Sequence, residues 1–421
     1  MLINNTYNSA NFKEEHRKTP KDFTRICKFT LPSLIEIILN FSNSSLQTEL
    51  NKYFKTKQQG KVARQYATDG GFVKARKKFS SSAFVELLQV AVQAFYQKAK
   101  IQTWYGFRIL AVDGSKYSLP NTPSVIKEFG GQDNQFGLKP MALGSCLYDV
   151  YQGIVLDAKL MHYSSSERDL AFEHLQHTSD NDLILYDRGY VAYWLVLAHI
   201  NAKRDFCMRI RSNFNKQTKA FEKSSKRDMV ITLDPSDEII AHAKAKGLSI
   251  EPVTVRLLKV KTSKGEYLLM TTLLDNTHYP RKDFTDLYHM RWQIEEAYKA
   301  QKCRFEVENF SGESVLSIQQ DYHACMLNHV LTAISCYYAQ GYVSKRVAKR
   351  KLAYKINFSK AISSVKDILV SALNGLLLDI DIQESLQTIS KNLTPIRPGR
   401  SFEREKIRCR RLMCRKGYRY A

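Results

Sequence analysis

The order of apolar and polar segments predicts a mixed α/β fold, and two observations support this. Three apolar-rich runs follow one another between residues 109 and 163, and the last two are separated by Tyr151-Gln152-Gly153, which is typical of a hairpin turn. Between residues 166 and 210, helix-like and strand-like segments alternate. A meander followed by alternating helices and strands predicts a mixed sheet with helices on both faces.

Two strands of this core are each predicted to end at an aspartate. Ile109 to Val112 form an apolar run that ends at Asp113, and Gly114 is expected to break the strand directly after it. Leu183 to Tyr186 form a second run, which ends at Asp187. The carboxyl ends of strands are where active sites of α/β proteins collect, although a single aspartate at such a place is equally explained as a helix cap or turn residue.

The remaining elements follow from capping and periodicity. Ser166, three residues before an aspartate, predicts the start of a helix that runs to about residue 178. We expect a helix from about 191 to 203 and a strand over 206–210. Residues 212–280 contain the segments MVITLD, VTVRLLKVK and YLLMTTLLD and are predicted to form a β-rich insertion, because they are too many for a simple loop.

Four polar residues recur at helical spacing near the end of this region. Tyr288, Arg291, Glu295 and Lys302 stand at offsets of 0, 3, 7 and 14, which places them within an arc of about 60° if one helix carries them all. Lys299 lies at about 20° on the same wheel. Such a face offers a carboxylate for a hard metal ion and cations for phosphate oxygens. The alternative is a solvated helix face with weak ion pairs.

Together, Asp113, Asp187 and Glu295 favour a nuclease-type metal site. Three carboxylates are able to hold two divalent ions about 3.5–4 Å apart, one of which activates the attacking oxygen while the other stabilises the leaving oxygen. Two strand-end aspartates and a glutamate on a cationic face are harder to explain as caps than either aspartate alone.

The segments around these positions resemble the DDE transposases of the bacterial insertion-sequence family four, which carry a YREK signature. Asp113 stands in VDGS, Asp187 in YDRGY, and Glu295 in HMRWQIEEAYKAQK, which includes Trp292 beside the arginine. The downstream stretch VENFSGESVLSIQQDYHA is also similar, so that the likeness extends from about residue 105 to about residue 335.

This resemblance implies a ribonuclease-H-like, retroviral-integrase-like catalytic core that acts on DNA. Asp113, Asp187 and Glu295 would be the catalytic, metal-binding triad, with two Mg²⁺ ions as cofactor and Mn²⁺ as a substitute. The expected partner is double-stranded DNA, both transposon ends and target, bound by a homodimer on paired ends. By the same resemblance, Tyr288, Arg291 and Lys302 would contact DNA phosphates. Lys299, Trp292 and Arg188 are further candidates for DNA binding.

Composition agrees with a nucleic-acid partner. The 421 residues include 64 Lys plus Arg against 41 Asp plus Glu, a formal net charge of +23, which favours polyanion binding; a merely basic protein is the alternative.

No apolar run approaches the ~18 residues needed to span a bilayer, and no signal peptide is evident. We therefore expect a cytoplasmic protein, associated with the nucleoid when bound to DNA, and no membrane partner. No phosphate-binding glycine loop occurs, so no nucleotide cofactor is expected. The eight cysteines form no CxxC pair, and neither a zinc site nor a disulfide framework is indicated.

The flanks of the catalytic region are predicted to be helical and basic. Residues 1–100 contain apolar helical patterns and a basic stretch from Lys55 to Lys78, which favours a helical N-terminal DNA-binding domain; a plain solvated helical domain is the alternative. Residues 101–335 are predicted to form the catalytic domain, and 336–421 a helical C-terminal region whose basic tail starts at about Arg397. Such a tail attracts phosphate backbones without reading sequence.

These observations predict a transposase that cuts DNA at the ends of a mobile element and joins the freed 3′ hydroxyls to a target. Two alternatives remain open. One is a related nuclease or resolvase that hydrolyses DNA without strand transfer, and the other is a catalytically silent DNA-binding relic of a transposase.

Overall fold

The computed structural model describes residues 2–25, 27–42, 44–60, 65–135, 137–262, 265–348 and 350–397. The chain divides into two units, each of which contains segments that are distant in sequence. Unit 1 consists of Met1–Ala99, Ser118–Pro140 and Ala300–Ala421, and unit 2 of Lys100–Tyr117 and Met141–Lys299. Most of the predicted basic tail, residues 398–421, lies outside the described residues.

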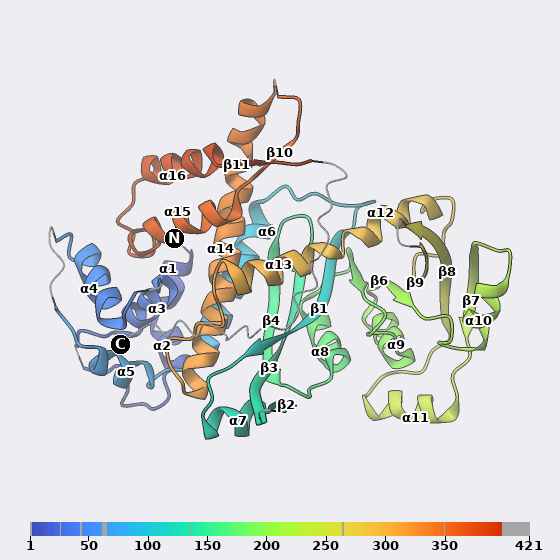
Figure 1. Ribbon diagram of the computed structural model, residues 1–421, viewed down its shortest axis with the longest axis horizontal. Coiled ribbons are helices and arrows are strands. Elements are labelled where there is room, and N and C mark those ends of the chain that lie inside the picture. Colours follow the sequence, from blue (N-terminus) through green and yellow to red (C-terminus); the bar gives the residue numbers. More distant parts are fainter. Residues whose placement is uncertain are drawn as a thin grey trace. The chain divides into compact units, whose positions relative to one another are not determined.

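A large mixed sheet forms the centre of unit 2 (Figure 1). The strand order is β2-β3-β1-β5-β6-β9-β8-β7, with β4 paired to β3; the short strand β2 (Gly131–Asn134) belongs to a segment of unit 1. Parallel pairing joins β1 to β5 and β5 to β6, whereas β3 with β4, β6 with β9, β9 with β8 and β8 with β7 are antiparallel pairs. The main strands are β1 (Arg108–Ser118), β3 (Gly137–Asp149), β4 (Ile154–His162), β5 (Asp182–Tyr186), β6 (Asp205–Ile210), β7 (Asp228–Leu233), β8 (Val253–Thr262) and β9 (Gly265–Thr271).

The predicted hairpin and the two strands predicted at 183–186 and 206–210 are confirmed. Strands β3 and β4 pair antiparallel on either side of residues 150–153, and β5 and β6 occupy the ranges expected for them. All five residues of β5 are buried, as expected for a central strand with both faces covered. Asp187 follows β5 directly and thus lies at its carboxyl end.

The prediction that Gly114 ends the first strand is wrong. Strand β1 continues through Asp113 and Gly114 to Ser118. Glycine fits this position because the Glu167 side chain occupies the space that a Cβ would need. A Cβ atom built on Gly114 would lie 2.7 Å from Glu167 Oε1. A glycine inside a strand often marks such a close approach rather than a break.

Two helices of unit 2 lie where capping and periodicity predicted them. Helix α8 (Glu167–His174) begins after Ser166, whose hydroxyl accepts a hydrogen bond from the Asp169 amide, and a 3₁₀ turn continues it to His177. Helix α9 (Tyr193–Ala202) packs against β6 and β8. Its last turn closes on Lys203 in the left-handed conformation, which is a common way to end a helix.

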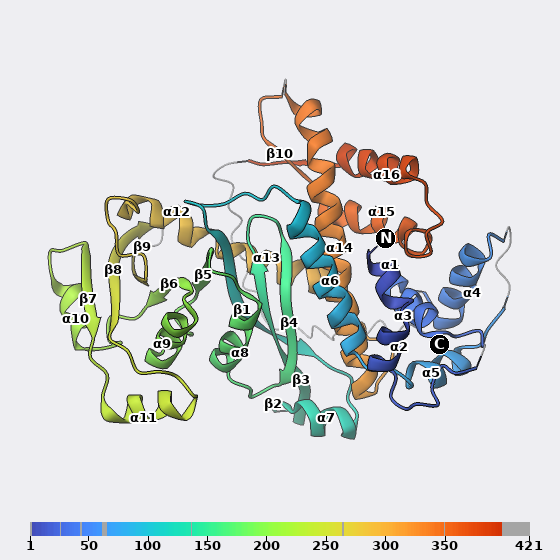
Figure 2. The same cartoon turned by 180° about the vertical axis from the view of Figure 1, so that it is seen from behind.

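The segment 212–280 contains the three predicted strands, and they extend the central sheet. Strand β9 pairs with β6 from Cys207↔Thr271 to Ile210↔Leu268, and β8 and β7 follow outward from it. Two helices, α10 (Lys216–Lys223) and α11 (Asp237–Ala245), alternate with these strands. Figure 2 shows the same order from behind.

Unit 1 is built mainly of helices around the 33-residue helix α14 (Val315–Val347). Helices from both ends of the chain pack on it, so that N-terminal and C-terminal segments share this unit. The helices are α1 (Leu2–Tyr7), α2 (Ala10–His16), α3 (Leu31–Asn40), α4 (Leu46–Lys57), α5 (Asp69–Arg76), α6 (Ser82–Lys98), α7 (Pro123–Phe129), α15 (Phe358–Leu373) and α16 (Asp379–Lys391).

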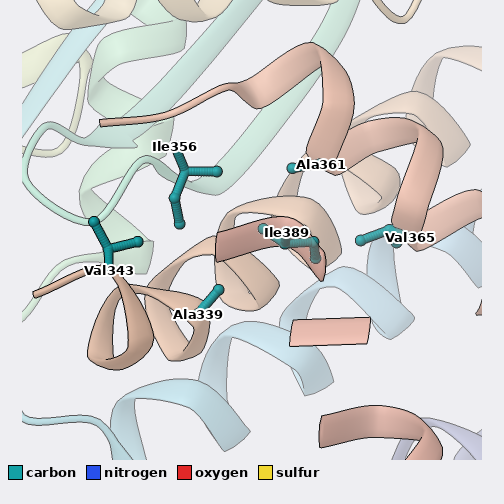
Figure 3. Packing of buried hydrophobic residues seen from close by; sticks show 6 residues of the cluster. All are labelled: Ala339, Val343, Ile356, Ala361, Val365 and Ile389. Carbon is teal, nitrogen blue, oxygen red and sulfur yellow. The ribbon is translucent and has the colours of Figure 1, made fainter. Parts of the chain in front are cut away.

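One apolar cluster of unit 1 joins four elements of the C-terminal region (Figure 3). Ala339 and Val343 come from α14, Ile356 from the short strand β10 (Tyr354–Ile356), and further side chains from α15 and α16. Strand β10 pairs with β11 (Leu393–Pro395). The apolar periodicity of α15 thus buries one face against α14. Among the described residues, no helix is both long enough and apolar enough to cross a bilayer.

Candidate active site

Asp113 and Glu295, predicted as two members of the triad, share one cation in unit 2. Arg291 lies between them, with its guanidinium 2.8 Å from Glu295 Oε1 and 3.5 Å from Asp113 Oδ2. The arginine side chain is 12% exposed, so these pairs are shielded from most of the solvent. Residues that are far apart in sequence are therefore brought to one point at the middle of β1.

Burial is the main influence on Asp113 and raises the pKa of its carboxyl to about 6. Arg291 and the Gly114 amide, which donates a 2.9 Å hydrogen bond to Asp113 Oδ1, lower this pKa, whereas the charges of Glu167 and Glu295 raise it. Carboxylates that repel one another are typical of sites that bind cations, because a metal ion relieves the repulsion.

The prediction that one continuous helix carries the whole tetrad is wrong. Helix α12 (Phe284–His289) carries Tyr288, helix α13 (Trp292–Cys303) carries Glu295 and Lys302, and Arg291 lies in the turn between them. The Arg291 amide bonds to the Tyr288 carbonyl, three residues back. This tighter bonding interrupts the regular 3.6-residue rotation that a helical wheel assumes.

Asp187 lies in a different part of the site, with Tyr288. Both residues line a cavity of about 400 Å³ in unit 2, together with Arg291 and Trp292. The Tyr288 hydroxyl donates a 3.3 Å hydrogen bond to the Tyr186 carbonyl. Burial raises the pKa of this phenol, and the charge of Asp187 adds to the shift, so Tyr288 is a neutral hydrogen-bonding group at ordinary pH.

Sequence reasoning missed Arg209, a cation in the same cavity. Its guanidinium carbon lies 3.8 Å from the centre of the Tyr267 ring, within cation–π range. Arg209 belongs to β6, and Tyr267 to the neighbouring strand β9. An arginine inside the apolar strand sequence DFCMRI is the signal that points to it.

The other predicted DNA-binding residues lie in more varied surroundings. Arg188 is exposed, and its amide donates a 2.6 Å hydrogen bond to Asp187 Oδ1. Lys299 is 55% exposed and pairs with Glu296 on the same helix. Lys302 belongs to unit 1, where burial lowers its pKa and the charge of Glu308 opposes that shift.

Two tyrosines that the motifs did not identify lie near Asp113. The Tyr298 hydroxyl donates a 2.5 Å hydrogen bond to the Asp113 carbonyl. Tyr190 is 1% exposed, and its hydroxyl has no hydrogen-bond partner among the described residues. Burial raises the pKa of Tyr190, as do the charges of Asp113 and Glu167.

The carboxylates offer the oxygen ligands that hard divalent cations prefer, although among the described residues the oxygens of Asp113, Asp187 and Glu295 do not all lie within metal-ligand distance of one another. Oxygen ligands are available from carboxylates, and the orphaned Tyr190 hydroxyl would gain a partner from the water that such ions usually retain. In the part of the chain that the structure describes, Arg291 is the one cation that forms an ion pair with Asp113 or Glu295.

Comparison with known proteins identifies the family. The model of the family "Transposase DDE domain" matches residues 104–331, more than half of the chain. The transposase InsG for insertion sequence element IS4 of Escherichia coli (strain K12) is 29% identical over 239 residues, which are 56% of this chain and 53% of that protein. A putative transposase, y4zB, of Sinorhizobium fredii (strain NBRC 101917 / NGR234) is 27% identical over 153 residues, 36% of this chain and 42% of that protein. The chain thus spans about half the length of the curated relatives it matches.

A solved structure of the piggyBac transposase synaptic complex with hairpin DNA is similar, with a TM-score of 0.44 and 10% identity over 95% of this chain and 86% of that one. The family match covers Asp113, Asp187 and Glu295, and the InsG relative agrees with the resemblance to insertion-sequence family four. The chain therefore belongs to the DDE transposase family.

Proposed function

We propose that this protein is a metal-dependent transposase, which cleaves DNA at the ends of a mobile element and joins the freed 3′ hydroxyls to target DNA. The observation that carries the proposal is the gathering of Asp113 and Glu295 around Arg291, which also lines the cavity that Asp187 reaches from the carboxyl end of β5. A ribonuclease-H-like core, with the strands of 212–280 as its insertion, is the fold we propose for this site.

Asp113, Asp187 and Glu295 would hold the metal, for which we propose two Mg²⁺ ions with Mn²⁺ as a substitute. When bound, these ions would supply Lewis-acid chemistry at the scissile phosphate. Glu295 Oε1 and Asp113 Oδ2 already lie on one guanidinium, so a metal ion that binds these oxygens would compete with Arg291 and release it. The released guanidinium would then be available to a phosphate oxygen of DNA.

The cavity beside Asp187 is suited to position the DNA backbone. Tyr288 is a neutral phenol at its wall, able to donate a hydrogen bond to a phosphate oxygen, and Arg291 lines the same wall. Trp292 offers an apolar surface next to them. Arg188, Lys299 and Lys302 would add phosphate contacts that contribute affinity without reading sequence.

Partners and organisation follow from this activity. The partner is double-stranded DNA, and a homodimer on paired ends would join two ends in one event. Residues 1–100 would form a DNA-binding domain, 101–335 the catalytic domain and 336–421 a basic C-terminal region. No nucleotide cofactor is required, because phosphodiester exchange conserves the bond energy. We place the protein in the cytoplasm, and on the nucleoid when it is bound to DNA.

The test uses purified full-length protein, Mg²⁺, a supercoiled plasmid and a labelled duplex that ends in the inverted repeats flanking the gene. We expect a labelled product covalently joined to plasmid. Glu295→Gln should reduce both cleavage and joining to background, whereas its neighbour Glu296→Gln, exposed and paired with Lys299, should retain them. Cleavage without joining would indicate a nuclease, and DNA binding unaffected by Mg²⁺ without any cleavage would indicate a silent relic.

A further inference from the structure

A fourth carboxylate, Glu167, lies against the strand that carries Asp113. A Cβ built on Gly114 would lie 2.7 Å from Glu167 Oε1 and 2.9 Å from Glu167 Cδ. The carboxyl group therefore occupies the space that only glycine leaves open, one residue after Asp113. The backbone of Gly114 is not in the left-handed region, so the need for glycine here comes from this contact and not from its φ angle.

Helix α8 is fixed in a way that holds Glu167 in this place. Glu167 is the first residue of α8, directly after the Ser166 cap. At the far end of the helix, His174 is buried and bonds to Asp157 Oδ2 at 2.7 Å through Nδ1 and to Ser145 Oγ at 3.0 Å through Nε2. These two partners lie on β4 and β3, so both ends of the helix are tied to local structure.

The Glu167 carboxylate has no bonded partner in the described part of the chain. It is partly buried, and no side chain or amide in that part forms an ion pair or hydrogen bond with it. Burial lowers the pKa of Lys116, and the charge of Glu167 opposes that shift without an ion pair between them; the Lys116 ammonium donates a hydrogen bond to the Tyr163 carbonyl. The same charge acts on Asp113 and on the orphaned Tyr190 hydroxyl. A partly buried carboxylate beside a second carboxylate is unfavourable unless a cation joins them.

We propose that Glu167 is a fourth carboxylate of the metal site, and that it binds one of the divalent cations together with Asp113. This inference rests on the proposed function, because it assumes that Asp113 holds a metal ion. It assigns a binding role to a residue outside the DDE triad. It also explains why Gly114 follows Asp113: any larger residue would displace the Glu167 carboxylate.

The test measures Mn²⁺ binding to the metal-free full-length protein, by the electron paramagnetic resonance signal of free Mn²⁺, with no DNA present. Glu167→Gln keeps the shape of the side chain and removes its charge, and we expect a loss of Mn²⁺ affinity of about 10-fold or more. The matched control is Glu173→Gln on the same helix. The Glu173 side chain is 45% exposed and pairs with Lys159, so the Mn²⁺ affinity of Glu173→Gln should equal that of the wild type.

Gly114→Ala tests the same inference without changing any charge. The new methyl group would displace the flexible end of Glu167, because that is the nearest group to the added Cβ. We expect weaker Mn²⁺ binding in Gly114→Ala, and no further weakening when it is added to Glu167→Gln. This non-additivity is the signature of two changes that act through one contact.

The outcomes separate this inference from the proposed function. Wild-type affinity in both Glu167→Gln and Gly114→Ala, with affinity lost in Asp113→Asn, would overturn the role of Glu167 and leave the proposed function in place. Wild-type affinity in Asp113→Asn and Asp187→Asn as well would overturn both. A fall in thermal stability of Glu167→Gln with unchanged Mn²⁺ affinity would make Glu167 structural. If Glu167→Gln fails to fold, Gly114→Ala alone decides.

Discussion

The two units each contain a buried arginine that pairs with acidic side chains, and the two clusters differ in charge balance. In unit 1, Arg76 bonds to Asp321 at 3.0 Å, to Gln320 at 2.9 Å and to Ser311 at 2.7 Å. One cation thus meets one carboxylate, and neutral acceptors satisfy the remaining donors. Such an arrangement is complete by itself and has the features of a structural cluster.

In unit 2, Arg291 meets an excess of negative charge. It pairs with Asp113 and Glu295, and the charges of Asp187 and Glu167 also act on this group of residues. Two carboxylates that share one guanidinium leave an excess of negative charge, and a site that keeps such an excess in the folded chain is suited to bind a cation. Charge balance, and not the presence of a buried ion pair, therefore separates a structural cluster from a functional one.

The largest expected effect is in the balanced cluster. Arg76→Ala would leave the Asp321 carboxylate, 10% exposed, without its cation, and we expect a loss of about 3–5 kcal/mol in the free energy of unfolding. Urea unfolding measures it. Lys299→Ala, which breaks an exposed pair with Glu296 in unit 2, is the control and should cost no more than about 0.5 kcal/mol. Equal effects for the two variants would contradict the structural role of Arg76.

The buried Asp157–His174 pair of unit 2 should also stabilise the fold, and its contribution should depend on pH. Burial alone would raise the pKa of Asp157, but its hydrogen bond and charge pairing with His174 outweigh burial and lower the pKa to about 2. The stability from this depressed pKa is present above about pH 4, the unfolded value, and is lost as the pH falls through about 2. Asp157→Asn should therefore lose about 2 kcal/mol near pH 7 and almost nothing near pH 2.

Urea unfolding of the wild type and Asp157→Asn at several pH values checks this prediction. Asp180→Asn is the matched control, because Asp180 forms an ion pair with Arg204 but is 86% exposed. A difference between Asp157→Asn and the wild type that stays constant from about pH 7 down to about pH 2 would show that the loss comes from packing and not from the charge.

The unbalanced cluster should respond with the opposite sign. Burial raises the pKa of Asp113 to about 6, so the stability linked to this group is present below about pH 4 and is lost as the pH rises through about 6. Because asparagine does not ionise, Asp113→Asn should be more stable than the metal-free wild type near pH 7, by about 1–2 kcal/mol, and equal to it near pH 4.

Metal ions provide the second arm of this experiment. Added Mg²⁺ should raise the unfolding temperature of the wild type at neutral pH, because a ligand that binds only the folded state stabilises it, and should leave Asp113→Asn unchanged. Thermal unfolding with Mg²⁺ and with a chelator measures both. If Asp113→Asn proved less stable than the wild type without metal, the cluster would be a structural network like that of Arg76.

Much of the site was predictable because its residues lie in local patterns. The apolar run before Asp187 predicts a strand with an acid at its end, and β5 confirms it. The spacing of the tetrad indicated that Arg291 and Glu295 belong together, and they form an ion pair. These predictions succeed because strand ends and helix spacings of three to seven residues are properties of the local backbone.

What the sequence did not predict depends on contacts between distant segments. The prediction of a strand break at Gly114 fails because the reason for this glycine is its contact with Glu167. That contact joins residues distant in sequence and leaves no local pattern. The turn at Arg291 was missed because a helical wheel assumes one uninterrupted helix. The composition of segment 212–280 predicts β-strands but not their partners, and pairing of β9 with β6 joins them to the central sheet; strand partners are not encoded in strand composition.

The smallest effect on stability is expected for the lysines that belong to neither cluster. Their substitution should weaken DNA binding while changing the free energy of unfolding little. Lys299→Ala removes an exposed residue that pairs with Glu296 on its own helix, and Lys302→Ala removes a partly buried one. Each substitution should change the free energy of unfolding by no more than about 0.5 kcal/mol. Because each lysine would neutralise one phosphate, each substitution should lower affinity for duplex DNA and reduce by about one the slope of log affinity against log salt concentration. Fluorescence anisotropy at several salt concentrations measures this slope. If Lys302→Ala instead destabilised the fold as strongly as Arg76→Ala, its cation would belong to a balanced structural cluster of unit 1 and not to a surface that binds DNA.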